Sequence, residues 1–277
     1  MNYQEGRKRL LAGKFCEHIK TYLLSLDPSN WPTCQELNRL VHRHSEVIVN
    51  ANGMDIQFVP QLERPKVFDA GFEQRTFLTG EVQVRPQNWH DLLNALVWLL
   101  FPKSKSALNA RHFSVLQNDV AKGRSPQGDA LTIFDEEGVI VVSRNPRLTQ
   151  LLKEFQWIEI FYESRGEVMQ DMSFSIFGHA LFEKTLNPYV GMTGKALILA
   201  DPSGAIATSS PSLSPAAIDT LLSKLIPNQE LFKSGRNFSP LPMLGLPGCW
   251  DDNLKLEFFL NDSYFRHQKN RNQKVRE

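Results

Sequence analysis

Residues 88–113 read NWHDLLNALVWLLFPKSKSALNARHF, and they decide much of the fold. The first part, 88–101, is apolar enough to predict a buried helix, with Asn88 as the residue that caps its N-terminus. Pro102 separates it from a second helix, which we expect to begin near residue 104 or 106 and to end near 120. The question raised by this stretch is why a core helix carries so many polar side chains.

On a helix over 88–101, the leucines, valine and Trp89 cover most of the circumference and leave one polar stripe. The stripe consists of His90, Asp91, Asn94 and Trp98. Burying an unpaired polar group costs about 1–3 kcal/mol, so the stripe must face polar partners, water or a ligand.

A second His-bearing stripe is predicted on a helix over 171–185, where Ser175, His179 and Glu183 follow one another at intervals of four residues. A histidine and a glutamate one turn apart can chelate a divalent metal, or they can act as a base and the carboxylate that orients it. Such a pair is also common as a purely structural ion pair.

These two stripes predict an enzyme, hydrolase-like, whose site lies between helices 88–101 and 171–185. In this hypothesis the catalytic residues are two imidazoles with acid–base or metal-ligand roles and two orienting carboxylates: His90, His179, Asp91 and Glu183. A divalent metal is the cofactor that such groups would hold, and the candidate ligands are His90, Asp129, His179 and Glu183.

The second half of the opening stretch supplies candidate substrate-binding residues that suit an anionic small molecule. They are Asn94, Lys103, Lys105, Asn109, Arg111 and His112. The alternative for the two lysines is an ordinary solvated pair at the start of a helix.

Two further readings stay open beside the enzyme. A non-catalytic module for nucleic acid or protein would use a basic loop over 122–128, Arg111 and the C-terminal tail, although a formal net charge of +1 disfavours nucleic acid. In a purely structural interpretation, the stripes form a buried polar network that fixes helix packing and binds no ligand.

Composition favours a soluble cytoplasmic protein. The 277 residues include three widely spaced cysteines without a CxxC pair, which argues against a disulfide framework and a structural zinc site. The most apolar helical run is about half the length that a membrane span needs, and the N-terminus lacks a signal-peptide pattern.

The remaining pattern predicts an α+β fold in a single mixed domain over 1–266, mostly helical, with two or three β-hairpins forming a small antiparallel sheet. Strands are expected at 55–60 and over 75–86 with a turn at Gly80, and two similar hairpins at 129–141 and 195–207. Further helices are expected at 7–26, at 33–44 with a capping box, after Asn145, and after Ser214. Residues 267–277 are expected to be a disordered polar tail.

The opening stretch also resembles the signature of an uncharacterised proteobacterial domain-of-unknown-function family. The resemblance covers the chain from about 76 to 266. Its other pieces are DALTIFDEEGVIVVS, FGHALFEKTLNPYVGMTGKAL, PLPMLGLPGCW and FFLNDSYFR. The resemblance implies a bacterial protein and places the first seventy residues in the same compact unit. It implies no particular activity and gives no role to either histidine.

Overall fold

The computed structural model describes residues 1–61, 71–119, 125–201 and 213–266. The chain is α+β, as predicted. It divides into two compact units, of which the first comprises Met1–Val139, Ile176–Asn187 and Leu213–Phe238, and the second comprises Ile140–Ser175, Pro188–Ser212 and Ser239–Glu277. The prediction of a single domain over 1–266 stays a prediction.

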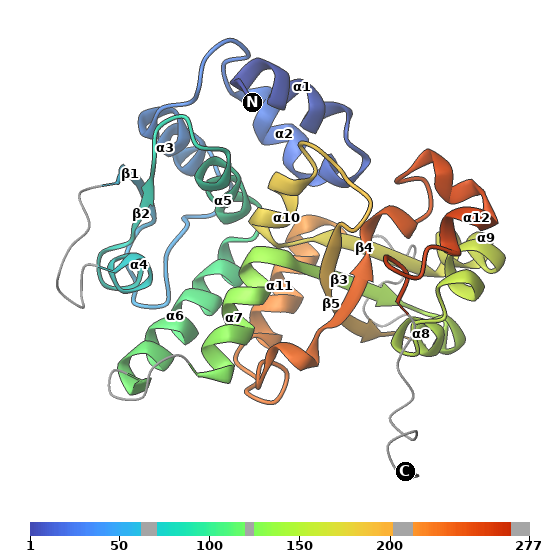
Figure 1. Ribbon diagram of the computed structural model, residues 1–277. Helices are drawn as coiled ribbons and strands as arrows, with labels where there is room; N and C mark the ends of the chain where they lie inside the picture. Colours follow the sequence, from blue (N-terminus) through green and yellow to red (C-terminus); the bar gives the residue numbers. More distant parts are fainter. Residues whose placement is uncertain (62–70, 120–124, 202–212, 267–277) are drawn as a thin grey trace. The chain divides into compact units, whose positions relative to one another are not determined.

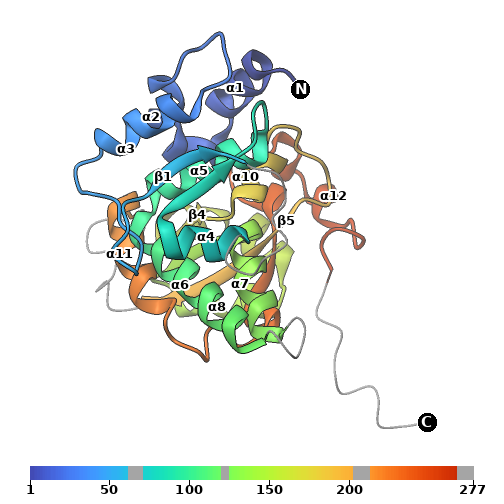
Figure 2. The ribbon, with the colours of Figure 1, turned by 90° about the vertical axis from the view of Figure 1, so that its left-hand side faces the viewer.

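The first unit is mainly helical, and the opening stretch lies at its centre (Figure 1). Its helices are α1 (Tyr3–Ala12), η1 (Lys14–Cys16), α2 (Glu17–Ser25), α3 (Cys34–His42), α4 (Phe72–Thr79), α5 (Trp89–Leu100), α6 (Pro102–Asp119), α7 (Pro126–Glu137), α10 (His179–Lys184), α11 (Pro215–Leu225) and η4 (Gly235–Asn237). Its two strands, β1 (Gln57–Pro60) and β2 (Glu81–Val84), pair in parallel with Gln57 opposite Glu81. Figure 2 shows this pair of parallel strands with α4 beside it.

Helix α5 is the core of the first unit. Every residue from Leu92 to Leu100 is buried, and so is Trp89. Asn88 caps the helix by accepting a hydrogen bond from the Asp91 amide, as predicted. Trp89 stacks against Tyr3 of α1, so the N-terminal residues pack within the first unit.

The second unit is built on a four-stranded sheet in the order β4-β3-β5-β6. Its strands are β3 (Gly138–Ser143), β4 (Met172–Ile176), β5 (Thr193–Ala200) and β6 (Ser239–Pro242), with β5 and β6 antiparallel. The helices are α8 (Pro146–Lys153), η3 (Glu159–Glu163), α9 (Arg165–Asp171), η5 (Met243–Gly245), η6 (Asp251–Leu254) and α12 (Leu256–Phe259). Phe259 and Phe265 are buried, so the final aromatic segment docks within this unit.

Two predicted elements that bear on the site are corrected. Residues 126–137 form helix α7, so the predicted hairpin at 129–141 is wrong: Ser125 caps the helix, Pro126 begins it, and only β3 is extended. The predicted helix over 171–185 is a strand followed by a short helix. The amides of Phe177 and Gly178 both donate to the Gly138 carbonyl, and this pairing ends β4 before α10 begins.

Other boundaries also differ. Residues 72–79 are helical, and Gly80 ends that helix at a φ of +77° instead of turning a hairpin. The predicted helix at 7–26 breaks at Gly13. The structure confirms the capping box at Thr33, the helix after Asn145 and the helix after Ser214. The turn of the hairpin expected at 195–207, residues 122–124 of the basic loop and the tail lie outside the described residues, whereas residues 126–128 of that loop begin α7.

Candidate metal centre

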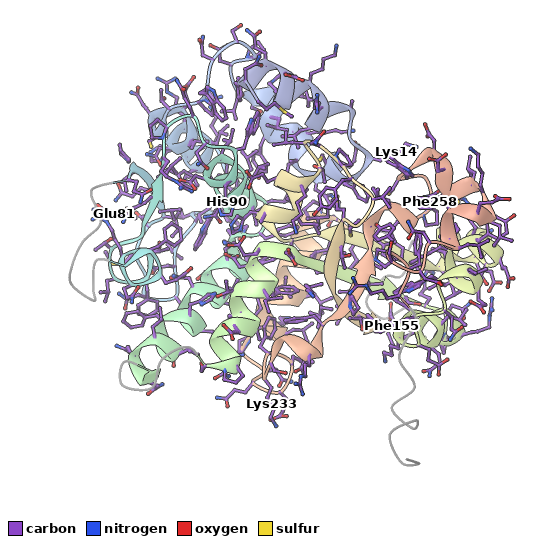
Figure 3. All side chains as sticks on the ribbon, viewed as in Figure 1. Lys14, Glu81, His90, Phe155, Lys233 and Phe258 are labelled. Carbon is purple, nitrogen blue, oxygen red and sulfur yellow. The ribbon has the colours of Figure 1, made fainter. Side chains whose placement is uncertain are left out.

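His90 lies in the first turn of α5, where that helix meets α10 (Figure 3). The neighbouring Asp91 is paired with Arg85. Its carboxylate accepts hydrogen bonds from the backbone amide and the guanidinium of Arg85, at 2.7–2.8 Å. Burial alone would raise the pKa of Asp91, but the Arg85 guanidinium outweighs burial and holds it below the ordinary value. The predicted catalytic role of Asp91 stays a prediction.

Gly178 brings His179 close to α7. A Cβ atom at Gly178 would stand 2.4 Å from the carbonyl oxygen of Glu136 and 2.5 Å from the amide of Glu137. Only glycine permits this approach of two backbones. His179 then begins α10 directly beside the last turn of α7, and its side chain is 5% exposed.

The two imidazole rings meet. His90 Nε2 lies 3.0 Å from His179 Nε2, and the ring planes stand at 77° to each other. One histidine from each predicted stripe therefore lies in this contact. Without an ion, this contact requires one of the two Nε2 atoms to carry a proton, because a hydrogen bond needs one donor.

Carboxylates occupy the other sides of both rings. Glu183, one turn after His179, accepts a hydrogen bond from His90 Nδ1 at 3.0 Å. Asp135 Oδ2 lies 3.7 Å from His179 Nδ1. A carboxylate that accepts from Nδ1, as Glu183 does from His90, favours the tautomer whose Nε2 lone pair is free to bind a metal, an arrangement that commonly supports metal-bound histidines. His179 Nδ1 is buried and makes no hydrogen bond among the described residues.

A third carboxylate lies on the Nε2 side of both rings. The Glu136 oxygens are 4.0 Å from His90 Nε2 and 3.9 Å from His179 Nε2. Among the described residues, His90, Glu136 and His179 form the one group whose ligand atoms are near enough to share an ion, all within 4.8 Å of one another. Ligands about 2.0–2.1 Å from a common zinc ion stand about 2.9–3.4 Å apart, so the imidazole pair already has a suitable spacing and Glu136 must approach by less than about 1 Å.

The protonation tendencies fit ligand roles. Burial lowers the pKa of His179 to about 4, which leaves this ring neutral near pH 7. The hydrogen bond with Glu183 raises the pKa of His90. Burial raises the pKa of Glu136, whereas the contact with His90 lowers that of Glu183. When no ion is bound, burial favours the neutral forms of Glu136 and His179. A bound divalent ion would instead favour the charged carboxylate of Glu136.

Lys105 supports the centre from inside the protein. Its side chain is 4% exposed, and its ammonium donates to Asp135 Oδ1 at 2.5 Å and to Asn94 Oδ1 at 2.9 Å. Burial alone would raise the pKa of Asp135, but the Lys105 ammonium holds it below the ordinary value. Lys105 is therefore neither a solvated lysine nor an open anion-binding group. It fixes the carboxylate that faces His179.

A pocket of about 620 Å³ opens over the centre. It is lined by Gln61, by the first residues of α4 with Gly71 before them, and by side chains of β2, α5, α6, α7 and α10. Among the residues that line it are the three candidate ligands and four other predicted or supporting groups: His90, Glu136, His179, Asp91, Asn94, His112 and Asp135.

The other predicted site residues have different surroundings. Lys103 pairs with Glu46 at 2.9 Å, and Arg111 donates to the carbonyl of Ile226 at 2.7 Å. Asn109 donates to Glu73. Asp129 lies in the first turn of α7, outside the three-residue group, and Ser175 lies on β4 instead of sharing a helical face with His179.

Asp135 and Glu136 were not among the predicted site residues. They belong to the sequence DEEG (135–138), which forms the turn of the hairpin predicted over 129–141. In that hairpin both carboxylates would lie on an exposed turn. The signal that would have found them is Ser125-Pro126, a cap followed by proline at the first helical position. The same signal at Ser214-Pro215 correctly predicted α11.

Comparison with known proteins identifies the family. Residues 56–269 match the family described as "Protein of unknown function (DUF3025)". The chain belongs to this family. Searches of curated proteins and of solved structures returned no significant match. In the described part of the chain, no helix has both the length and the apolar character needed to cross a membrane.

Proposed function

We propose that this DUF3025 protein is a divalent-metal-dependent hydrolase whose ion is held by His90, His179 and Glu136. The observation that carries the proposal is the convergence of two Nε2 atoms at 3.0 Å while the opposite nitrogen of each ring faces a carboxylate. Two histidines and one carboxylate form a ligand set that catalytic zinc uses, with a remaining position for water. A bound ion would lower the pKa of that water toward neutrality and so supply a nucleophile.

The surroundings support an active centre more than a structural one. A structural zinc site closes its coordination with four protein ligands, whereas here three candidate ligands line an open pocket. Glu183 and Asp135 would orient the rings, and Lys105 would hold Asp135 in place. Lys105 and its partners Asp135 and Asn94 form a buried hydrogen-bonded group beside the ligands.

The experiment uses the untagged full chain, because a histidine tag would add its own ligands. Elemental analysis after purification is expected to give one transition-metal ion per chain. Chelation should abolish hydrolysis of at least one substrate in a panel of chromogenic esters, amides and phosphate esters, and zinc should restore it. A protein that retains no ion when supplied with zinc, manganese, iron or cobalt would contradict the proposal, and so would hydrolysis that is unchanged by chelation.

The matched variants are His179→Phe and His42→Phe. His179 is a proposed ligand inside the pocket, whereas His42 lies at the end of α3, outside it. We expect His179→Phe to lose the ion and His42→Phe to keep it. Equal metal content in the two variants would show that the ion is bound elsewhere.

A further inference from the structure

The pocket beyond the ligands has a second polar wall, formed by Asn94 and His112. We infer that this wall binds an uncharged carbonyl substrate, an amide or an ester, with Asn94 holding the carbonyl oxygen and His112 facing the leaving atom. The inference rests on the proposed metal-dependent hydrolase and names the substrate class of that same site.

Lys105 settles the orientation of the Asn94 amide. An ammonium group can only donate hydrogen bonds, so the atom of Asn94 that contacts it at 2.9 Å is the oxygen. The Nδ2 amino group therefore points away from Lys105, on a side chain that lines the pocket. Asn94 lies one helical turn after His90, on the same face of α5. It thus presents a fixed donor next to the candidate metal ligand.

His112 is a buried histidine that the proposed centre does not use. It is 8% exposed, it lines the pocket, and its ring has no hydrogen-bond partner among the residues that the structure describes. It lies two turns after Lys105 on the same face of α6, and with Lys105 and Asp135 it also lines a small cavity of about 10 Å³ beside the pocket. His112 interacts electrostatically with Asp135 and helps to hold the pKa of that carboxyl below its ordinary value, and its ring nitrogens remain able to hydrogen-bond a ligand.

The charges around the pocket disfavour a polyanion. Four carboxylates line it, those of Glu73, Asp91, Asp135 and Glu136, against the single guanidinium of Arg85. Arg85 is paired with Asp91, and Lys105 is paired with Asp135. A divalent ion would neutralise the negative charge of Glu136, and its second positive charge would balance that of Glu73. Among the lining residues that the structure describes, no unpaired cationic group remains to balance a phosphate, so a neutral carbonyl suits this part of the site better than the anionic substrate predicted from the sequence.

In the resulting reaction, water is the only co-reactant. Its oxygen adds to the carbonyl carbon, and the bond from that carbon to the leaving nitrogen or oxygen breaks. One proton of the water passes to the leaving atom, and His112 is placed to deliver it. The Asn94 amino group would stabilise the negative charge that develops on the carbonyl oxygen.

The test uses cobalt-loaded full chain, because the visible absorption of bound cobalt changes when a ligand enters its coordination sphere. The probes are acetohydroxamate, a carbonyl chelator whose free acid is neutral near neutral pH and which loses one proton on binding a metal, and inorganic phosphate. We expect acetohydroxamate to bind more tightly than phosphate. The variants Asn94→Asp and His112→Phe should each weaken acetohydroxamate binding by about tenfold or more. Asn94→Asp keeps an oxygen for Lys105 and replaces the amino donor with a second carboxylate oxygen, which also adds a negative charge.

Cobalt affinity measured in the same variants shows whether the centre has kept its fold, and it should stay within about twofold of the parent. Gln117→Ala, an exposed position on α6, is the control and should change neither affinity. Tighter binding of phosphate would overturn the inference, and so would acetohydroxamate binding that neither substitution weakens. Failure of the parent chain to bind cobalt would instead overturn the proposed function, and this inference with it.

Discussion

The Nε2 atoms of His90 and His179 lie 3.0 Å apart, although 89 positions separate the two residues in the sequence. The Nδ1 atom of His90 donates a hydrogen bond to Glu183, and the Nδ1 atom of His179 lies 3.7 Å from the Asp135 carboxylate. The arrangement needs three backbone elements to meet, namely α5, α7 and α10. It is this relationship, more than any single residue, that points to a metal centre.

Glu183 is expected to act through His90 as a positioning residue. Glu183→Ala removes the acceptor for His90 Nδ1, so zinc affinity should fall by about 10–100-fold with little change in melting temperature. Glu183→Gln keeps an acceptor oxygen and should restore part of the affinity. Isothermal titration calorimetry measures both. Glu137→Ala is the control, since Glu137 pairs with Lys184 and forms no hydrogen bond or ion pair with either imidazole among the described residues. Equal losses of zinc affinity in Glu137→Ala and Glu183→Ala would rule out the positioning role.

Lys105 and Lys103 allow a comparison of a buried and an exposed cation in one helix. Lys105→Met leaves the buried Asp135 carboxylate without its cation, and the free energy of unfolding should fall by about 3–5 kcal/mol in urea denaturation. Lys103→Met removes an exposed pair with Glu46 and should have almost no effect. The double variant Lys105→Met, Asp135→Leu should recover most of the loss. If Lys105→Met were as stable as Lys103→Met, Asp135 would not depend on its ammonium.

Gly178 is expected to tolerate no side chain. In Gly178→Ala the new Cβ would meet the backbone of Glu136 and Glu137, so α10 must move away from α7 at a cost of about 1–3 kcal/mol. Zinc affinity should fall as well, because the movement separates His179 from Glu136. The matched control is Gly166→Ala in α9, where a Cβ meets nothing within 4 Å and alanine should stabilise the helix slightly. Thermal melting and zinc titration of both variants decide the matter, and unchanged values for Gly178→Ala would refute the close-approach argument.

Cys16 gives a pH-dependent prediction away from the centre. Burial raises the pKa of its thiol to about 11, whereas the unfolded chain has the ordinary value near 9. The unfolded state therefore loses its proton first, and the stability associated with this thiol, complete below about pH 9, is lost as the pH rises through about 11. Chemical denaturation across this range should show the decline, and Cys16→Ser should flatten it.

The same burial controls reactivity. Near about pH 8, a thiol reagent should modify the partly exposed Cys34 and Cys249 in the native protein and reach Cys16 only after unfolding. Rapid labelling of all three cysteines in the folded chain would contradict the assigned burial of Cys16.

The polar stripe on α5 could be predicted because a helix repeat of 3.6 residues places His90 and Asn94 on one face regardless of the rest of the fold. The cap at Asn88 and the buried leucines were predictable for the same local reason. The carboxylates were harder to assign. Residues 129–134 alternate well enough for a strand, and only the Ser125-Pro126 cap distinguishes the helix that carries Asp135 and Glu136.

Other parts of the centre depend on tertiary contacts that sequence periodicity does not encode. The start of α6 at Pro102 is an example, because its first amides are capped by Asp219 of α11, a residue 115 positions away from Ser104. The sequence alone predicts a surface position for Lys105, but its ion-pair partner Asp135 comes from α7, 30 positions away. His179 was assigned to a longer helix because the pairing of Phe177 and Gly178 with Gly138 is a long-range contact.

The central claim is tested most directly by zinc-edge anomalous diffraction from crystals of the full untagged chain grown with zinc. The account predicts one anomalous peak per chain, about 2.0–2.1 Å from the Nε2 atoms of His90 and His179 and from a Glu136 oxygen. A zinc peak elsewhere on the chain, with the two Nε2 atoms still in direct hydrogen-bond contact and no peak between them, would contradict it.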